Sequence, residues 1–202
     1  MEPFTTLTGI AVPLDEPNID TNQLCPTRFN KVPRGPEYAR VLLHDRRFNA
    51  DGSEKEFILN AEPYRQAKVV VADRNFGCGS SRESAVFALF EFGIRCVIAP
   101  SFGDIHANNC VKNGILPVVL PAADVAALRR QLREQVGATL AVDLARQTVT
   151  DPTGREHRFD IHPVRKLCLL EGLDDIARTG QYAARFAQFE TAYRAQKPWL
   201  FN

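Results

Sequence analysis

The chain has 202 residues, with 25 Lys and Arg against 24 Asp and Glu and a formal net charge of +1. This balance gives no electrostatic case for binding nucleic acid or a membrane surface. The length suits one domain with an appended helical segment. No apolar run approaches the roughly 20 residues of a membrane span.

Five cysteines stand at positions 25, 78, 96, 110 and 168, and no two form a C-x-x-C pair. This pattern favours neither a disulfide framework nor a zinc or iron–sulfur site, so we expect no metal on this chain. The first five residues lack the basic and apolar regions of a signal peptide. Free thiols without an export signal favour the cytoplasm.

In chain order, a first strand is predicted over 6–14, followed by a polar turn that ends at Pro26. Residues 26–40 then combine turn-forming residues with four basic ones, namely Pro26, Pro33, Gly35, Pro36, Arg28, Lys31, Arg34 and Arg40. We predict a mobile basic loop here. Composition alone favours a solvated connection without a further role.

From residue 68 onward, strands and helices alternate. The predicted strands are 68–72, 95–99 and 115–120, and the predicted helices are about 82–92, 103–112 and 122–136. This order implies an α/β fold with a parallel sheet and right-handed crossovers. Ligands of such sheets bind beyond the carboxyl ends of the strands.

The pattern of the last third of the chain predicts antiparallel strands added to the sheet, followed by a helical tail. Short strands are expected near 139–143, 146–150 and 156–161, with a turn at 151–154. The tail begins at about 163, with one helix that Gly172 ends and a last helix over about 181–196. Phe186, Phe189 and Tyr193 share one face of that last helix, which predicts core packing or a subunit contact.

The segment Asp73–Glu83 carries the strongest functional signal, since it connects a β-branched strand to a helical pattern. Its two glycines allow a tight turn and a close approach of a ligand to the backbone. Ser80 and Ser81 are predicted at a helix N-terminus, where N–H groups lack partners. Arg82 adds a guanidinium suited to a carboxylate or phosphate. We therefore predict an anion site.

Known loop motifs and simpler roles offer alternatives for this segment. The dinucleotide motif G-x-G-x-x-G fails because Arg82 replaces the third glycine, and the P-loop and G-x-S-x-G motifs are absent. Cys78 could act as a nucleophile with His106 as a distant base, although a lone cysteine beside glycine usually serves packing. The segment Ser80–Glu83 could also be only a helix cap. A cap does not explain Arg82, because a cation at a helix N-terminus is unfavourable without an anion.

Several segments resemble the aconitase swivel-domain family, and within it the small subunits of bacterial 3-isopropylmalate dehydratases. The central one is Asn75-Phe76-Gly77-Cys78-Gly79-Ser80-Ser81-Arg82-Glu83. The others, in the order of the family, are Asn18-Ile19-Asp20-Thr21, Lys31-Val32-x-Arg34, Ile98-Ala99-Pro100-Ser101-Phe102-x-Asp104-Ile105, Asn113-Gly114-Ile115-Leu116-Pro117-Val118 and Gly172-Leu173-Asp174-x-Ile176. The resemblance covers nearly the whole chain.

This resemblance implies a swivelling β/β/α domain, in which a parallel sheet lies beside a mixed, barrel-like sheet. It also implies a large-subunit partner that carries a [4Fe-4S] cluster, with no cofactor bound by this chain. The implied activity is a hydro-lyase that converts 2-isopropylmalate to 3-isopropylmalate in leucine biosynthesis and works only with that partner. Neither nucleic acid nor membrane is expected as a partner.

The resemblance also assigns residues. Ser80 matches the catalytic base, and Arg82 matches a residue that serves both catalysis and binding of a substrate carboxylate. Further substrate contacts are implied at Gly79, Ser81, Thr21, Asn22, Lys31 and Arg34. A helix N-terminus and a neighbouring guanidinium would stabilise the serine alkoxide.

The chain departs from the family pattern at three single positions and over the segment 103–110, and the changes at Asn22 and Ser84 bear on substrate choice. Asn22 stands where aspartate is usual, Ser84 where histidine is common, and Cys25 where an aliphatic residue is found. A paralogue that acts on dimethylmalate or methylmalate is therefore an alternative. A non-catalytic module that binds an anion or nucleotide is a further one.

Overall fold

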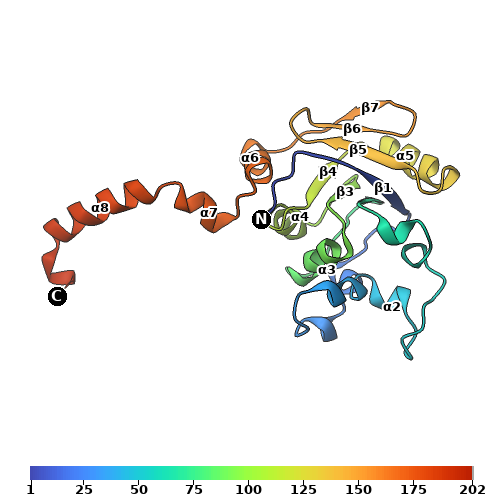
Figure 1. Ribbon diagram of the computed structural model, residues 1–202, viewed down its shortest axis with the longest axis horizontal. Coiled ribbons are helices and arrows are strands. Elements are labelled where there is room, and N and C mark those ends of the chain that lie inside the picture. The colour runs from blue at the N-terminus through green and yellow to red at the C-terminus, as the bar shows by residue number, and fades with distance from the viewer. Residues whose placement is uncertain (202) are drawn as a thin grey trace.

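The computed structural model describes residues 1–201 and shows a body built on one mixed sheet, with a helical arm that leads away from it (Figure 1). The seven strands are ordered β4-β3-β2-β1-β5-β6-β7. Their bounds are Thr6–Leu14 for β1, Val69–Ala72 for β2, Cys96–Ala99 for β3, Leu116–Val119 for β4, Thr139–Asp143 for β5, Thr148–Thr150 for β6 and Glu156–Arg158 for β7. The strand expected over 156–161 thus ends at Arg158.

Strand β1 joins the two halves of the sheet. Its residues 11–14 pair in parallel with β2, whereas residues 6–10 pair antiparallel with β5. Strands β2, β3 and β4 continue the parallel half, and β6 and β7 continue the antiparallel half. The predicted α/β class is therefore confirmed, and its parallel and mixed parts form one continuous sheet through a shared strand.

Helices cover both faces of the parallel half. The three helices after β2, β3 and β4 are α3 (Ser84–Phe92), α4 (Asp104–Lys112) and α5 (Ala122–Glu134). Side chains of β2 alternate between two cores, because successive residues of a strand point to opposite faces. Val70 packs in the core that includes α3, and Val69 packs in the core that includes α5. Burial on both faces explains the continuous apolar run of this strand.

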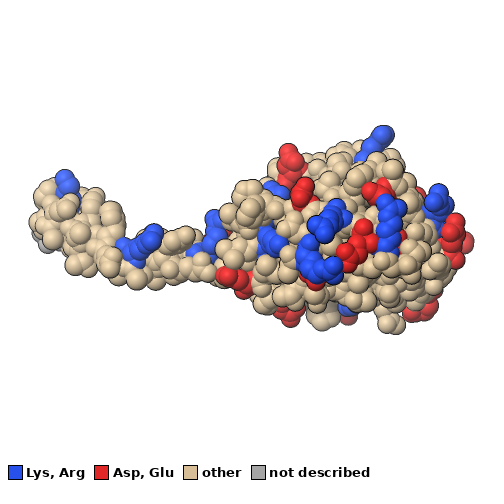
Figure 2. Space-filling model, turned by 90° about the horizontal axis from the view of Figure 1, so that it is seen from above, with Lys and Arg blue, Asp and Glu red and all other residues tan. Residues whose placement is uncertain are grey.

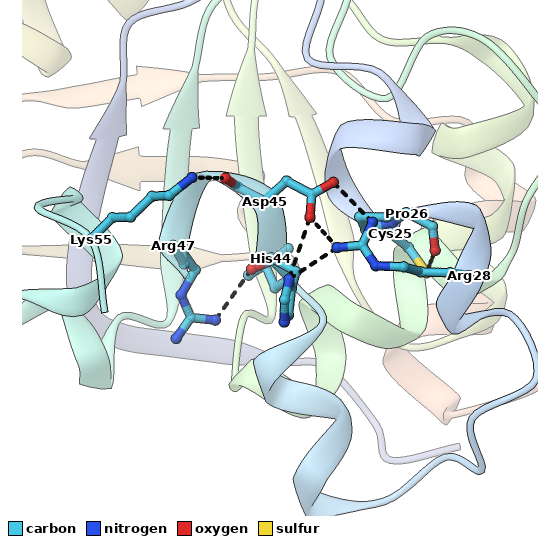
Figure 3. Close-up of polar contacts among 8 residues, drawn as sticks. Cys25, Pro26, Arg28, His44, Asp45, Arg47 and Lys55 are labelled. Atoms are coloured by element: carbon cyan, nitrogen blue, oxygen red, sulfur yellow. Dashed lines mark hydrogen bonds and ion pairs between the residues drawn. The ribbon is translucent and has the colours of Figure 1, made fainter. Parts of the chain in front are cut away.

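The long connection between β1 and β2 contains short helices. These are α1 (Thr21–Leu24), α2 (His44–Arg47) and four 3₁₀ turns at Thr27–Phe29, Pro36–Arg40, Ile58–Asn60 and Tyr64–Gln66. The segment 26–40, predicted as a mobile basic loop, thus contains two 3₁₀ turns, and its mobility stays a prediction. Tyr38 is buried in the core, and Arg28 bonds Asp45 and His44 of α2 (Figure 3). The buried ring of Tyr38 thus anchors to the core a segment whose composition predicted a solvated connection.

The C-terminal part consists of α6 (Pro163–Glu171), α7 (Asp175–Gly180), α8 (Ala183–Gln196) and a 3₁₀ turn at Pro198–Leu200. Gly172 ends α6 in the left-handed conformation, as expected. Phe186 and Phe189 are exposed and α8 projects from the body (Figure 1), so core packing is excluded and the alternative, a subunit contact, stays a prediction. Among residues 1–201, no helix combines the length and apolarity needed to cross a membrane.

Candidate functional site

Three loops meet at the carboxyl ends of β1, β2 and β3. The N–H of Gly77 donates to the carbonyl of Ile19 at 2.7 Å, and the N–H of Thr21 donates to the carbonyl of Cys78 at 3.0 Å. On the other side, the N–H of Gly103 donates to the carbonyl of Phe76 at 2.9 Å. The loop 75–82 is thus fixed between its two neighbours. This is the edge at which parallel sheets bind ligands.

Thr21 and Ser80 form the centre of the site. The backbone N–H of Ser80 donates to Oγ1 of Thr21 at 3.2 Å, and the Oγ atoms of the two residues lie 3.0 Å apart. Since Oγ1 of Thr21 already accepts from that N–H, its own proton is available for Oγ of Ser80. Thr21 is fully buried, while Ser80 is exposed to solvent. The rigid threonine therefore orients an accessible hydroxyl.

Arg82 is held beside this pair by uncharged groups. Its Nη1 donates to Oδ1 of Asn22 and, at 2.9 Å, to Oγ1 of Thr27. Thr27 in turn donates to Asn22 at 3.2 Å. Within residues 1–201, no carboxylate forms an ion pair with Arg82. The guanidinium is thus oriented while its charge stays available to an anion.

The helix after the loop starts later than expected. α3 begins at Ser84, and its N-cap residue is Glu83, whose side chain makes no capping bond. The predicted positions of Ser80 and Ser81 at the helix N-terminus are therefore wrong, and the expected cap over Ser80–Glu83 does not form. Ser80 is therefore held by its hydrogen bonds to Thr21 and not by a helix N-terminus. The Glu83 carboxylate instead accepts from Asn113 at 2.8 Å.

A cavity of about 240 Å³ opens next to Ser80. Its lining consists of Gly77, Gly79, Ser80, Gly103, Asp104, Ile105 and His106. His106 is buried, and within the described chain neither of its ring nitrogens has a hydrogen-bond partner. Burial lowers the pKa of this imidazole to about 4, so the ring is neutral near pH 7. The cavity offers room for a small acid next to the Ser80 hydroxyl.

Cys78 lacks the features of an activated nucleophile. Burial and, to a smaller extent, the charge of Asp20 raise the pKa of its thiol. Reactive cysteines show the opposite shift, because a thiolate requires stabilisation by positive charge. His106 packs against Phe76, with ring centroids 5.6 Å apart. The structure therefore gives no support to a Cys78–His106 pair.

The predicted contacts divide into two groups. Gly79, Ser80, Ser81, Arg82, Thr21 and Asn22 gather in one place, but Lys31 and Arg34 do not join them. Arg34 donates from Nε to Glu91 at 2.7 Å and lies over the rings of Phe87 and Phe90. Glu91 is in the last turns of α3, while Ser80 precedes its first. Lys31 is exposed, and its side chain has no hydrogen bond or ion pair to the described residues.

Sequence reasoning missed two residues of the site. Thr27 orients Arg82, and Asn30 accepts from the hydroxyl of Ser84 at 3.1 Å. Both lie in the segment 26–40, where a small polar side chain is indistinguishable from an ordinary loop residue. The proline content of the segment gave no signal that would separate Thr27 from its neighbours.

The residues present do not suit a metal cluster. In the described range 1–201, no three His, Cys, Asp or Glu side chains converge as a metal-binding group. All five cysteines are free, and Cys25, Cys96 and Cys110 are buried. Burial raises the pKa of Cys96 and Cys110, which opposes the thiolate form that a metal requires.

Comparison with known proteins identifies relatives of this chain by sequence and by fold. A family model described as aconitase C-terminal domain matches residues 1–123, and a model described as LeuD_N matches residues 126–163. A crystal structure of 3-isopropylmalate dehydratase from Methanocaldococcus jannaschii is similar with a TM-score of 0.65 and 21% identity. The match covers 91% of this chain and 98% of that one, and it supports the fold.

Curated relatives extend the similarity to the full length. The 3-isopropylmalate dehydratase small subunit of Paramagnetospirillum magneticum is 49% identical over 99% of this chain and 100% of its own length. The small subunit of the same name from Gluconacetobacter diazotrophicus is 50% identical over 98% of this chain and 97% of its own length. The chain therefore belongs to the family of 3-isopropylmalate dehydratase small subunits, within the larger family that shares the aconitase C-terminal domain.

Proposed function

We propose that this chain is the small subunit of a hydro-lyase that interconverts 2-isopropylmalate and 3-isopropylmalate in leucine biosynthesis. The observation that carries this proposal is the contact of Ser80 with Thr21 beside a guanidinium that no carboxylate of residues 1–201 neutralises. Full-length similarity to small subunits of this name supports the same conclusion.

In this proposal Ser80 acts as the base. Dehydration of a malate requires removal of a proton from carbon next to a carboxylate, which builds up negative charge. The Ser80 alkoxide takes that proton and becomes a hydroxyl, and it returns a proton when water adds back at the neighbouring carbon. Thr21 stabilises the alkoxide by donating its hydroxyl proton across the 3.0 Å contact, because an alkoxide has no proton of its own and can only accept.

Arg82 binds a substrate carboxylate in this proposal. A guanidinium can donate two parallel hydrogen bonds to a carboxylate, which fixes orientation as well as charge. Asn22 and Thr27 hold it in place, while Ser81 and the backbone at Gly79 supply further donors. Arg34 and Lys31 would contact substrate only after a rearrangement of the segment 26–40, because Arg34 is bound to Glu91.

The proposal includes a large-subunit partner that holds a [4Fe-4S] cluster. Such a cluster would supply a Lewis acid for the leaving hydroxyl. The exposed loop 79–81 at the sheet edge is the surface that such a partner would cover. We place the reaction in the cytoplasm, and the five free thiols support this assignment.

An anaerobic hydration–dehydration assay tests the proposal. The chain is mixed with a cluster-bearing large subunit, and 2-isopropylmalate, dimethylmalate and methylmalate are compared, with each protein alone as the control. We expect turnover only in the mixture, with the highest kcat/KM for isopropylmalate. Preference for another alkylmalate would identify a paralogue. A formed complex with intact cluster but no turnover of any of the three would contradict the enzyme assignment.

A further inference from the structure

The C-terminal arm, residues 175–201, exposes large apolar side chains. Ile176 is 84% exposed, Phe189 66% and Trp199 63%. Figure 2 shows the arm as a narrow extension whose surface is mostly uncharged and is interrupted by basic side chains. Exposed aromatic surface of this kind marks a protein interface in a water-soluble body.

The arm lacks the packing that stabilises a helix in a protein. None of the residues of α8 is buried. Helices of this length are marginal in water without tertiary contacts, because nucleation is unfavourable. Its internal contacts are few and local, such as the stacked rings of Phe189 and Tyr193 at 5.4 Å and the ion pair of Arg194 with Glu190. A partner surface would supply the missing burial.

Helix α4 connects the arm to the candidate site. Its first residues, Asp104 and Ile105, line the cavity beside Ser80. Its last residue, Lys112, forms an ion pair of 2.7 Å with Asp175, where the arm begins. Nine helical residues span about 13 Å, so the site and the root of the arm lie within the footprint of one protein interface.

The surface between the site and the arm carries exposed apolar side chains. Ile105 on α4 and Val164 and Leu167 on α6 are exposed. A small groove of about 140 Å³ lies between α4, α6 and the root of the arm, and Val111, Val164 and Leu173 contribute apolar walls to it. Exposed apolar side chains therefore occur between the cavity and the arm, among polar ones such as Asn108 and Arg165.

We propose that the arm binds the large subunit, at an apolar surface with acidic side chains at its rim. This inference rests on the proposed function, in which the large subunit covers Ser80 next to the N-terminal end of α4. The arm begins next to the C-terminal end of the same helix, within reach of that subunit. The arm carries four basic residues, Arg178, Arg185, Arg194 and Lys197, and two acidic ones. Both acids have partners within the chain, namely Lys112 for Asp175 and Arg194 for Glu190. Arg178, Arg185 and Lys197 therefore keep a positive charge that would complement an acidic rim on the large subunit.

Substitutions in the full-length chain test the proposal. The arm variant is Phe186→Ala, Phe189→Ala and Trp199→Ala combined, at positions that no core contact constrains. The matched control is Val119→Ala with Val136→Ala, which removes exposed apolar groups from the body. The Kd for the large subunit is measured by titration under anaerobic conditions, and self-association of the chain alone is measured by sedimentation.

We expect the arm variant to raise Kd at least about tenfold, while the control variant changes it less than about twofold. An unchanged Kd of the arm variant would overturn the proposal. Weaker self-association with an unchanged Kd would assign the arm to a second copy of this chain and would also overturn it. A wild-type complex without turnover would contradict the proposed reaction while Kd still reports on the arm. Absence of any wild-type complex would overturn both.

Discussion

The hydroxyl oxygens of Thr21 and Ser80 lie 3.0 Å apart, although 59 residues separate them in the chain. Thr21 is the first residue of α1, which follows β1, and Ser80 lies in the loop after β2. The parallel pairing of the two strands brings their carboxyl ends to one edge of the sheet. A buried hydroxyl thereby supports an accessible one.

Removal of the Ser80 hydroxyl tests its role as the base. Ser80→Ala should lower kcat by at least about 10²-fold, because a positioned base contributes this much or more to proton transfer. The complex with the large subunit should still form, and the free energy of unfolding should change little, since the Ser80 side chain is exposed in the isolated chain. Steady-state kinetics of the complex and urea unfolding of the chain provide the measurements. Turnover near the wild-type value would exclude Ser80 as the base.

A negative charge at position 22 should compete with the substrate. Asn22→Asp places a carboxylate where Arg82 now contacts a neutral amide. We expect KM to rise about tenfold, which corresponds to about 1.4 kcal/mol of binding free energy, with a smaller change in kcat. Asn22→Ser, which adds no charge, is the control and should change KM less. Equal KM values for the two variants would show that the Arg82 charge does not bind the substrate.

The fit of Gly77 against His106 should be intolerant of a methyl group. Gly77 has φ of +69°, and a Cβ there would lie 2.1 Å from Cδ2 of His106. Gly77→Ala should destabilise the fold by about 2–4 kcal/mol through backbone strain and overlap. Gly154→Ala is a matched control, because Gly154 has φ of +89° with nothing within 4 Å of a Cβ.

Gly154→Ala should lower the free energy of unfolding by about 1 kcal/mol, from backbone strain alone. Urea unfolding measures the stability of both variants, and the difference between them gives the cost of the overlap between the new methyl group and His106. Equal losses of stability would mean that the imidazole moves aside without cost, and the loop would then not be held by His106.

His106 should make stability depend on pH below neutrality. Its pKa is about 4 in the folded chain and 6.5 by reference, so the unfolded chain binds more protons between these values. Stability is therefore retained above pH 6.5 and falls as pH decreases toward 4, by about 3 kcal/mol at most. His106→Phe should remove this slope and leave a fold of equal or greater stability at pH 7, because two unpartnered nitrogens are lost.

Urea unfolding at several pH values between 4 and 7.5 measures both effects. An unchanged slope in His106→Phe would assign the pH dependence to other groups. A large loss of stability at pH 7 would instead show that a ring nitrogen contributes to the fold.

The sequence by itself determined the alternation of strands and helices from residue 68 onward. The continuous apolar run of β2 and the glycine that ends α6 are local features of the sequence, and local sterics and burial govern them. The turn at Gly79 and the charge of Arg82 could be recognised for the same reason, since both lie within one short segment, and an anion site there stays a prediction.

Only the tertiary structure decided which distant groups meet. It brought Thr21 to Ser80 and Thr27 to Arg82, while it placed Arg34 on Glu91 at the far end of α3. It also left the aromatic face of α8 exposed, although the same periodicity suits a core helix. An amphipathic pattern specifies that a face needs burial, but the packing of whole elements decides whether the chain itself supplies the cover.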